Sequence, residues 1–235
     1  MKKKLRTDGQ LRYPVRADSG AIMADDPATV FVIDDDASVR DALDSLIRSV
    51  GLKVQSFDSP AAFLRQRPFD TPACLVLDVR MPGSSGLDFH RELRQSAIEL
   101  PTIFITGHGD IPMAVEAMKA GAIEFLTKPF RDQDLLDAIQ RGLTLSRTHN
   151  REIAASAHLK QRFEELSPRE RQIMAFVVAG RLNKQIAAEL HVSEITVKVH
   201  RGQLMRKMQA RSLVDLVRIA DHLGIHAEMQ SAQHG

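Results

Sequence analysis

The stretch CLVLDVRMPGSSG, residues 74–86, decides the fold. It opens with an unbroken apolar run that ends at Asp78, and Met81, Pro82 and Gly83 then form a turn signal. A buried parallel strand has this pattern, and open α/β sheets carry their chemistry at the carboxyl ends of such strands. Asp78 is therefore a candidate reactive carboxylate, although a lone Asp after a strand is more often only a turn residue.

Strand-like and helix-like segments alternate five times around this stretch. The expected strands are 29–33, 53–57, 75–78, 101–106 and 123–127. The segments between them have helical spacing of apolar residues, and Ser84 or Ser85 can cap the helix expected over 85–97. This alternation predicts an α/β fold, a doubly wound, five-stranded parallel sheet with helices on both faces.

Length and composition limit the class of protein. The 235 residues allow two domains, and a hydrophobic fraction of 43% supports packed cores. No apolar stretch approaches the roughly 20 residues that span a bilayer. The basic N-terminus lacks the apolar region of a secretory signal, and the single cysteine, Cys74, cannot form an intramolecular disulfide. We therefore expect a cytoplasmic protein with no membrane partner.

The two halves of the chain carry opposite charge. Residues 29–146 hold 17 Asp and Glu against 12 Lys and Arg, whereas residues 147–235 hold 9 against 14, giving −5 and +5. An acidic half can bind a cation and a basic half can approach a polyanion. Two functions in two domains are expected.

The basic half has the pattern of four short helices. Ser167, Pro168 and Glu170 form a capping box with proline at the first helical position, and Gly180 ends that helix. Further helices are expected over 183–190, 194–208 and 213–223, with a tight turn at His191 and Val192. This spacing predicts an all-α helix-turn-helix DNA-binding domain.

Polar residues follow several strands of the predicted sheet. Asp34 and Asp35 follow the first strand, Asp78 the third, Thr106 the fourth and Lys128 the fifth. Crowded carboxylates require a cation, and oxygen ligands without nearby Cys or paired His favour Mg²⁺. A carboxylate beside such a metal can accept a phosphoryl group, with Thr106 and Lys128 contacting its oxygens. The predicted chemistry is phosphoryl transfer to Asp78.

The motifs VFVIDDDASVR, LVLDVRMPGSSG and ITGHGDIPMAVEAMKAGAIEFLTKPF, with the basic C-terminal unit, resemble a FixJ-like response regulator of the NarL/LuxR class. The resemblance implies a CheY-like receiver domain in which Asp78 is the phosphoacceptor. It implies that Mg²⁺ is bound by Asp34, Asp35, Asp78 and the backbone carbonyl of Arg80. It also implies a switch pair, Thr106 and Phe125, and a phosphoryl contact from Lys128 through a cis Lys128–Pro129 bond. By position alone, Phe125 is more often a core residue than a switch. His90 is expected at the surface and His108 in a loop, and neither is assigned a role.

The helix over 194–208 has an outward basic face. Lys198 can donate to guanine or phosphate, Val199 can contact a thymine methyl group, and Gly202 allows close approach in the major groove. The resemblance implies base contacts from Lys198 and Val199 and nearby phosphates for Lys184, Thr196 and Lys207. Arg201 and Arg206 complete the expected DNA contacts, whereas base recognition at Gly202 is left open.

The resulting hypothesis is a two-component transcriptional regulator. Its expected partners are a sensor histidine kinase, double-stranded promoter DNA, RNA polymerase and a second copy of itself on activation. Two alternatives are a DNA-binding regulator that ignores phosphorylation and an aspartate-nucleophile phosphatase, which usually has a second Asp where this chain has Arg80. The expected parts are a disordered extension, 1–28; a receiver, 29–146; a helical linker, 147–163; a DNA-binding domain, 164–224; and a disordered tail, 225–235.

Overall fold

The computed structural model describes residues 28–65, 71–109 and 111–225. The chain divides into two compact units, residues 1–150 and 151–235, and the long helix α5, Asp132–Glu164, contains the division. Helix α5 continues through residues 147–163, the range predicted to be a helical linker, and the role of this range as a linker stays a prediction. The predicted disordered ends lie outside the described residues except for Ala28 and Ile225.

The first unit is built on one parallel sheet in the order β2-β1-β3-β6-β7. Its strands are β1, Thr29–Ile33; β2, Lys53–Phe57; β3, Ala73–Asp78; β6, Thr102–Thr106; and β7, Glu124–Thr127. All four pairings in this sheet are parallel. The doubly wound sheet predicted from the alternation of segments is confirmed. The β3 strand is central, and this places Asp78 at the middle of the carboxyl edge.

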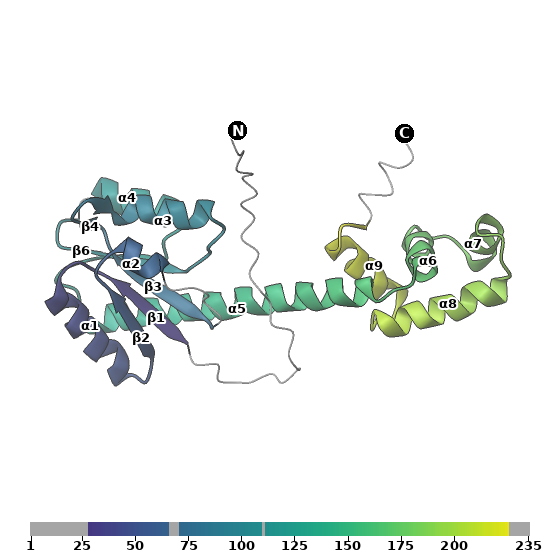
Figure 1. The fold of residues 1–235 in the computed structure, drawn as a ribbon, viewed down its shortest axis with the longest axis horizontal. Helices are drawn as coiled ribbons and strands as arrows, with labels where there is room; N and C mark the ends of the chain where they lie inside the picture. The colour runs from purple at the N-terminus through teal and green to yellow at the C-terminus, as the bar shows by residue number, and fades with distance from the viewer. Residues whose placement is uncertain (1–27, 66–70, 110, 226–235) are drawn as a thin grey trace, which may run out of the picture. The chain divides into compact units, whose positions relative to one another are not determined.

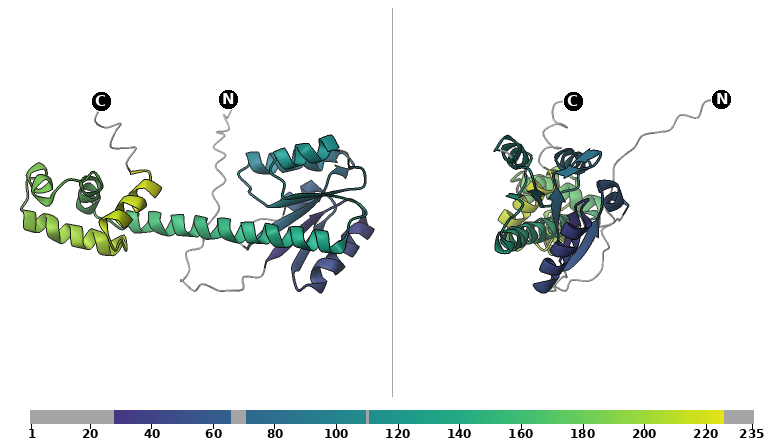
Figure 2. Two further views of the ribbon diagram at one scale, coloured as in Figure 1. Left: turned by 180° about the vertical axis from the view of Figure 1, so that it is seen from behind. Right: turned by 90° about the vertical axis from the view of Figure 1, so that its left-hand side faces the viewer.

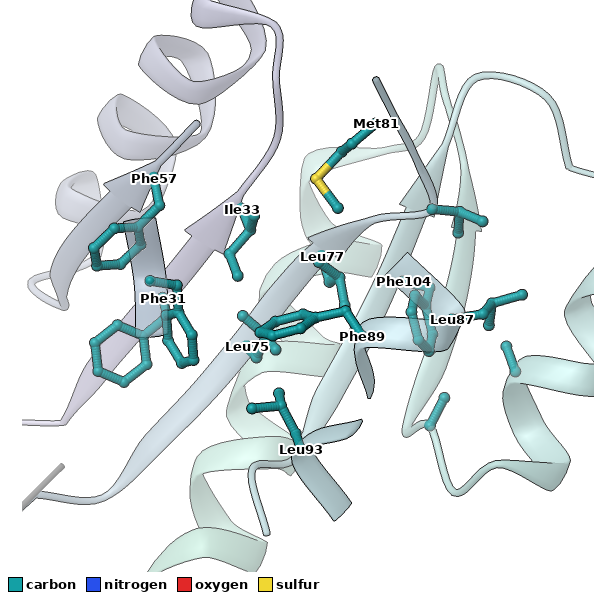
Figure 3. Packing of buried hydrophobic residues seen from close by; sticks show 14 of the residues in the cluster. Phe31, Ile33, Phe57, Leu75, Leu77, Met81, Leu87, Phe89, Leu93 and Phe104 are labelled. Carbon is teal, nitrogen blue, oxygen red and sulfur yellow. The ribbon is translucent and has the colours of Figure 1, made fainter. Parts of the chain in front are cut away.

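In the part of the first unit that the structure describes, five helices cover the sheet: α1, Ala37–Ser49; α2, Pro60–Leu64; α3, Gly86–Gln95; α4, Ile111–Lys119; and the first part of α5. Figure 1 shows α2, α3 and α4 on one face and α1 with α5 on the other, and Figure 2 shows the same layers from behind. Alternate strand residues enter two separate cores. One contains Phe31, Leu75, Leu77, Phe89 and Phe104, as Figure 3 shows, and the other contains Val30, Val76, Ile103, Ile139 and Leu143.

The segment after β3 differs in detail from the prediction. The expected turn at Pro82 and Gly83 closes a two-residue hairpin of β4, Arg80–Met81, and β5, Ser84–Ser85. Gly83 has a φ of +77°, which glycine adopts without strain. Ser85 occupies the N-cap of α3, as one of the two predicted positions, but its side chain makes no capping hydrogen bond. The backbone of Ser85 is engaged in the hairpin instead.

The prediction that His90 lies at the surface is also wrong. His90 is 3% exposed, and its ring packs edge-on against Phe104 with 5.4 Å between ring centroids. Burial lowers the pKa of His90, and the nearby Arg94 guanidinium lowers it further. His90 follows Phe89 on α3, and both belong to the side of this helix that the sheet covers. The burial of His90 could not be predicted from its local sequence, because charged residues follow it in the chain.

Within its described residues, the second unit contains four further helices: α6, Pro168–Val178; α7, Asn183–Glu189; α8, Glu194–Lys207; and α9, Leu213–His222. The predicted capping box of Ser167 and Glu170 is present, and Ser193 caps α8 by accepting from the Thr196 N–H at 3.1 Å. Helix α8 packs against both α6 and α7. Val197, Leu204 and Met208 are buried in the shared core, as their helical spacing predicted. The four-helix arrangement with a tight turn between α7 and α8 is confirmed.

Candidate functional site

Two carboxylates and one ammonium group meet at the carboxyl edge of the sheet. Asp34 follows β1 and Asp78 ends the neighbouring strand β3, so parallel pairing places their side chains together. Lys128, which follows β7, reaches both: its Nζ lies 2.6 Å from Asp34 Oδ2 and 3.0 Å from Asp78 Oδ1. Asp34 and Asp78 are 1% and 5% exposed. The structure therefore brings together three of the predicted residues in one buried ion-pair cluster.

Backbone groups fix the orientation of the two carboxylates. The Asp36 N–H donates to Asp34 Oδ1 at 3.0 Å, and the Arg80 N–H donates to Asp78 Oδ2 at 2.9 Å. The Arg40 guanidinium donates to the backbone carbonyls of Asp34 and Asp35, at 2.7 and 2.9 Å. Arg40 was not among the residues predicted for this site. Its only signal was a basic residue in the first turn of the helix that follows three consecutive aspartates.

Burial has opposite consequences for the two signs of charge in this cluster. Burial raises the pKa of Asp78, and the negative charge of Asp34 raises it further against the opposing effect of Lys128. Burial alone would lower the pKa of Lys128, but its hydrogen bonds to Asp34 and Asp78 outweigh burial, and the pKa is raised. Lys128 therefore remains a cation at neutral pH and offsets part of the repulsion between the carboxylates.

The predicted switch residues lie beside this cluster on neighbouring strands. Thr106, at the end of β6, is fully buried, and its Oγ1 accepts the His108 N–H at 3.3 Å. Phe125, on β7, is partly buried against the core that faces α2, α3 and α4. Lys128 is tied to the same strand end, because its N–H donates to the Thr106 carbonyl at 2.7 Å. The Lys128–Pro129 bond is cis, as the resemblance implied.

Two glycines that the sequence analysis did not assign to the site are in close contact with its residues. A Cβ atom on Gly109 would lie 2.6 Å from Thr127 Cγ2, 3.0 Å from Phe125 Cε1 and 3.2 Å from Thr106 Cγ2. A Cβ atom on Gly86 would lie 2.2 Å from the backbone oxygen of Asp78. Their spacing from the strand ends was visible in the sequence, but the contacts depend on the tertiary structure.

The donor set of the cluster suits a hard cation. Asp34 and Asp78 offer oxygen atoms only, which is the ligand type that Mg²⁺ prefers. Asp35 is exposed, and within the described residues no group of three or more His, Cys, Asp or Glu side chains is positioned to hold a metal ion. Two carboxylates therefore meet in the structure, and the expected contributions of Asp35 and of the Arg80 carbonyl stay predictions.

The predicted DNA-binding residues separate into two groups. Lys184, Lys198, Val199 and Arg206 are exposed, and the last three lie on the outward face of α8, opposite its buried residues. The others have partners inside the unit. The Thr196 hydroxyl lies 2.8 Å from Ser193 Oγ, and Arg201 donates to Asn183 Oδ1 at 3.1 Å.

Lys207 joins α8 to the start of α6. Its Nζ lies 2.7 Å from Glu170 Oε2 and 3.3 Å from the Glu165 carbonyl oxygen. Glu170 is 2% exposed, and it also accepts the Ser167 N–H at 2.8 Å. Burial opposes ionisation of Glu170, but the bonds from Lys207 and Ser167 outweigh it and lower the pKa. Lys207 therefore stabilises the position of α8, and its predicted contact with DNA phosphate stays a prediction.

Comparisons with known proteins match both units. The family model of the response regulator receiver domain matches residues 30–140, and that of the luxR family of bacterial regulatory proteins matches residues 164–220. Nodulation protein W of Bradyrhizobium diazoefficiens is 52% identical over 216 residues, 92% of this chain and 95% of that protein. Transcriptional regulatory protein FixJ of the same organism is 43% identical over 196 residues, 83% of this chain and 96% of that protein. The solved structure of the response regulator StyR superimposes with a TM-score of 0.76 at 49% identity, covering 83% of this chain and 98% of that one.

The chain belongs to the two-component response regulators that join a receiver domain to a LuxR-type helix-turn-helix domain. Within this family it is a transcriptional regulator similar to FixJ, with a DNA-binding domain, and it is not a catalytic enzyme. The predicted family is confirmed, and the phosphatase alternative is wrong. Family membership implies a sensor kinase as partner and a receiver domain that generally uses Mg²⁺. No helix in the described part of the chain has the length and apolarity needed to cross a bilayer.

Proposed function

We propose that transfer of a phosphoryl group to Asp78 controls how this chain binds promoter DNA. The observation that carries the proposal is the buried cluster in which one ammonium group, that of Lys128, contacts the carboxylates of both Asp34 and Asp78. The Arg80 N–H already holds one oxygen of Asp78. An oriented carboxylate beside a permanent cation is suited to accept a phosphoryl group from a sensor histidine kinase.

In the proposed reaction, an Asp78 carboxylate oxygen attacks the phosphorus of a phosphohistidine. The new P–O bond forms as the P–N bond breaks, and its electron pair stays on the imidazole nitrogen. Lys128 leaves its contact with Asp78 and pairs with a phosphoryl oxygen. The Thr106 hydroxyl, which accepts a bond of 3.3 Å from the His108 N–H, turns to donate to another phosphoryl oxygen. The charge added at Asp78 thereby changes the positions of side chains at the ends of β6 and β7.

Mg²⁺ would be held by Asp34, Asp35, Asp78 and the backbone carbonyl of Arg80. When bound, it supplies positive charge that offsets the repulsion between the carboxylates and the incoming phosphoryl oxygens. The oxygen-only donors of Asp34 and Asp78 support this choice of metal. Asp35 is exposed on the loop that follows β1 and is free to turn toward an ion.

Dimerisation is the proposed output of the switch. The helix α4 exposes Ile111, Val115 and Met118, and α9 exposes Leu213 and Val214. We propose that movement of Thr106 and Phe125 changes the surface of α4 and β7 so that two receivers pair. The apolar residues of α9 then pair the two DNA-binding domains on a two-fold promoter site. Binding there, in the cytoplasm, would bring the regulator to RNA polymerase.

The DNA contacts proposed for this state come from α7 and α8. Lys198 and Val199 would meet base edges, and Lys184, Thr196, Arg201, Arg206 and Lys207 would lie near the phosphates. The exposed positions of Lys184, Lys198, Val199 and Arg206 support this assignment. Arg201 and Lys207 would have to exchange their partners within the domain, or share them, to contact DNA.

The test is DNA binding and oligomeric state with and without acetyl phosphate and Mg²⁺, at fixed salt because phosphate contacts depend on ionic strength. We expect the phosphodonor to tighten binding and produce a dimer in the wild type and to change neither in Asp78→Asn. Equal binding by both proteins under all conditions would instead support the constitutive alternative.

A further inference from the structure

The outward face of α8 carries an apolar stripe in which one residue, Ile195, is not among the expected DNA contacts. Ile195 is 76% exposed and Val199 is 55% exposed, one turn further along the helix. Gly202 continues the same line, and the space where its side chain would be is open, with no heavy atom within 4 Å of an added Cβ. The stripe therefore presents two branched apolar side chains followed by bare backbone.

Helical geometry shows that these three positions form one surface. At about 100° per residue, positions 195, 199 and 202 fall within about 60° of one another. Val197 and Leu204 lie on the opposite side and are fully buried. Ile195 and Val199 are therefore directed away from the core of their own domain.

The surroundings of the stripe are suited to nucleic acid. Lys198 and Arg206 are exposed beside it, and the half of the chain from 147 to 235 carries 14 Lys and Arg against 9 Asp and Glu. A cationic surface with an apolar centre suits the major groove, where phosphates flank the thymine C5-methyl groups. Ile195 is near the N-terminus of α8, and the N-terminal residues of a recognition helix contact base edges.

We propose that Ile195 is a base-reading residue that packs on the C5-methyl group of a thymine, next to the base contacted by Val199. The proposal rests on the proposed entry of α8 into the major groove. Ile195 then contributes to operator choice without a hydrogen bond or a phosphate contact, and its absence relaxes the preference for thymine at one position of each half-site.

The test begins with operator selection from a random duplex library at fixed salt, using the full-length wild type and Ile195→Ala. Ile153→Ala, a truncation of an exposed isoleucine on α5, is the matched control. Each thymine of the selected wild-type site is then replaced singly by 2′-deoxyuridine, which keeps the hydrogen-bonding groups and lacks only the methyl group.

We expect one thymine per half-site at which deoxyuridine weakens wild-type binding about fourfold, corresponding to roughly 0.8 kcal/mol for one buried methyl-sized group. The binding of Ile195→Ala should not weaken when this thymine is replaced by deoxyuridine. The variant should also no longer select thymine at that position, and its binding should depend on salt as that of the wild type does. Ile153→Ala should select the wild-type site. The deoxyuridine series on wild-type protein finds every thymine methyl group that is contacted, including one read by Val199. The same series on Ile195→Ala then identifies the methyl group that Ile195 contacts.

The proposal is overturned if no deoxyuridine substitution distinguishes wild type from Ile195→Ala, or if both proteins select the same bases. Lys198→Ala separates this failure from a failure of the proposed placement of α8. If Lys198→Ala alters the selected site while Ile195→Ala does not, α8 enters the groove and only the role of Ile195 is refuted. If neither changes it, the placement of α8 is refuted as well.

Discussion

Replacing Gly86 by alanine should destabilise the receiver more than any ordinary surface substitution. The added Cβ would lie 2.2 Å from the backbone oxygen of Asp78 and 3.1 Å from Val79 Cα, whereas ordinary contact begins at 3.4 Å. The obstructing atoms belong to the backbone of the central strand. The Gly86 N–H also donates to the Val79 carbonyl at 2.9 Å, so α3 cannot move away without losing this hydrogen bond.

The magnitude follows from the distance that must be gained. To restore ordinary contact, the start of α3 and the end of β3 must move apart by about 1.2 Å. Overpacking typically costs about 1–3 kcal/mol, and this case lies at the upper end because both segments are backbone. We expect a loss of about 3 kcal/mol or more. Because the end of β3 carries Asp78, the rate of phosphorylation by acetyl phosphate should fall as well.

Calorimetric unfolding of the full chain measures this effect, with Gly107→Ala as the matched control. Gly107 has no heavy atom within 4 Å of an added Cβ and has no positive φ, so alanine there should change stability by less than about 1 kcal/mol. At roughly 4 °C per kcal/mol, Gly86→Ala should lower the receiver transition by about 12 °C. The steric reasoning is refuted if the two alanine variants melt within about 4 °C of each other.

Four further predictions follow from the buried ionisable groups. Lys128→Met leaves the two buried carboxylates without their cation and should cost about 3 kcal/mol in urea unfolding, so an unchanged midpoint would contradict the ion-pair cluster. Because burial raises the pKa of Asp78, the stability that this group contributes is lost as pH rises, and Asp78→Asn should raise the midpoint of urea unfolding at pH 7 rather than lower it. Because the pKa of Glu170 is lowered, this carboxylate stabilises the helical unit at pH values above its ordinary pKa of 4.5, and the contribution is lost as pH falls. Lys207→Met should cost about 1 kcal/mol at pH 7 and make the melting temperature depend less on pH on the acid side. A plot of melting temperature against pH that runs parallel to the wild-type plot would argue against the ion pair. Burial raises the pKa of Cys74 to about 12, so iodoacetamide at pH 8 should modify it, as measured by mass spectrometry, only in denaturant, and rapid modification of the folded chain would show that the thiol is accessible.

Much of the candidate site was predictable because parallel sheets place strand ends together. An apolar run ending at Asp78, and another ending at Asp34, was enough to predict that these carboxylates meet, since neighbouring parallel strands finish at one edge. The cis bond before Pro129 followed from family resemblance. The DNA-binding helix was predicted from its caps and from the helical spacing of its buried residues.

Other features depended on packing between distant segments. His90 is buried although its local sequence is polar, because Phe104 of β6 packs against it. Lys207 was expected near DNA phosphate, yet its ammonium group contacts Glu170, 37 residues earlier. Hydrophobic periodicity reports which side of a helix is buried, but it contains no information on which distant side chain meets a given polar group.

The sequence by itself determined the order of strands and helices, the two domains, their opposite charges and the residues at the strand ends. These properties depend on local periodicity, caps and turns, which act over a few residues. Only the tertiary structure decided that Lys128 contacts both carboxylates, that Gly86 and Gly109 lie against the site, and that Ile195 is largely exposed. These facts depend on distances between segments that are far apart in the chain, and close packing sets those distances.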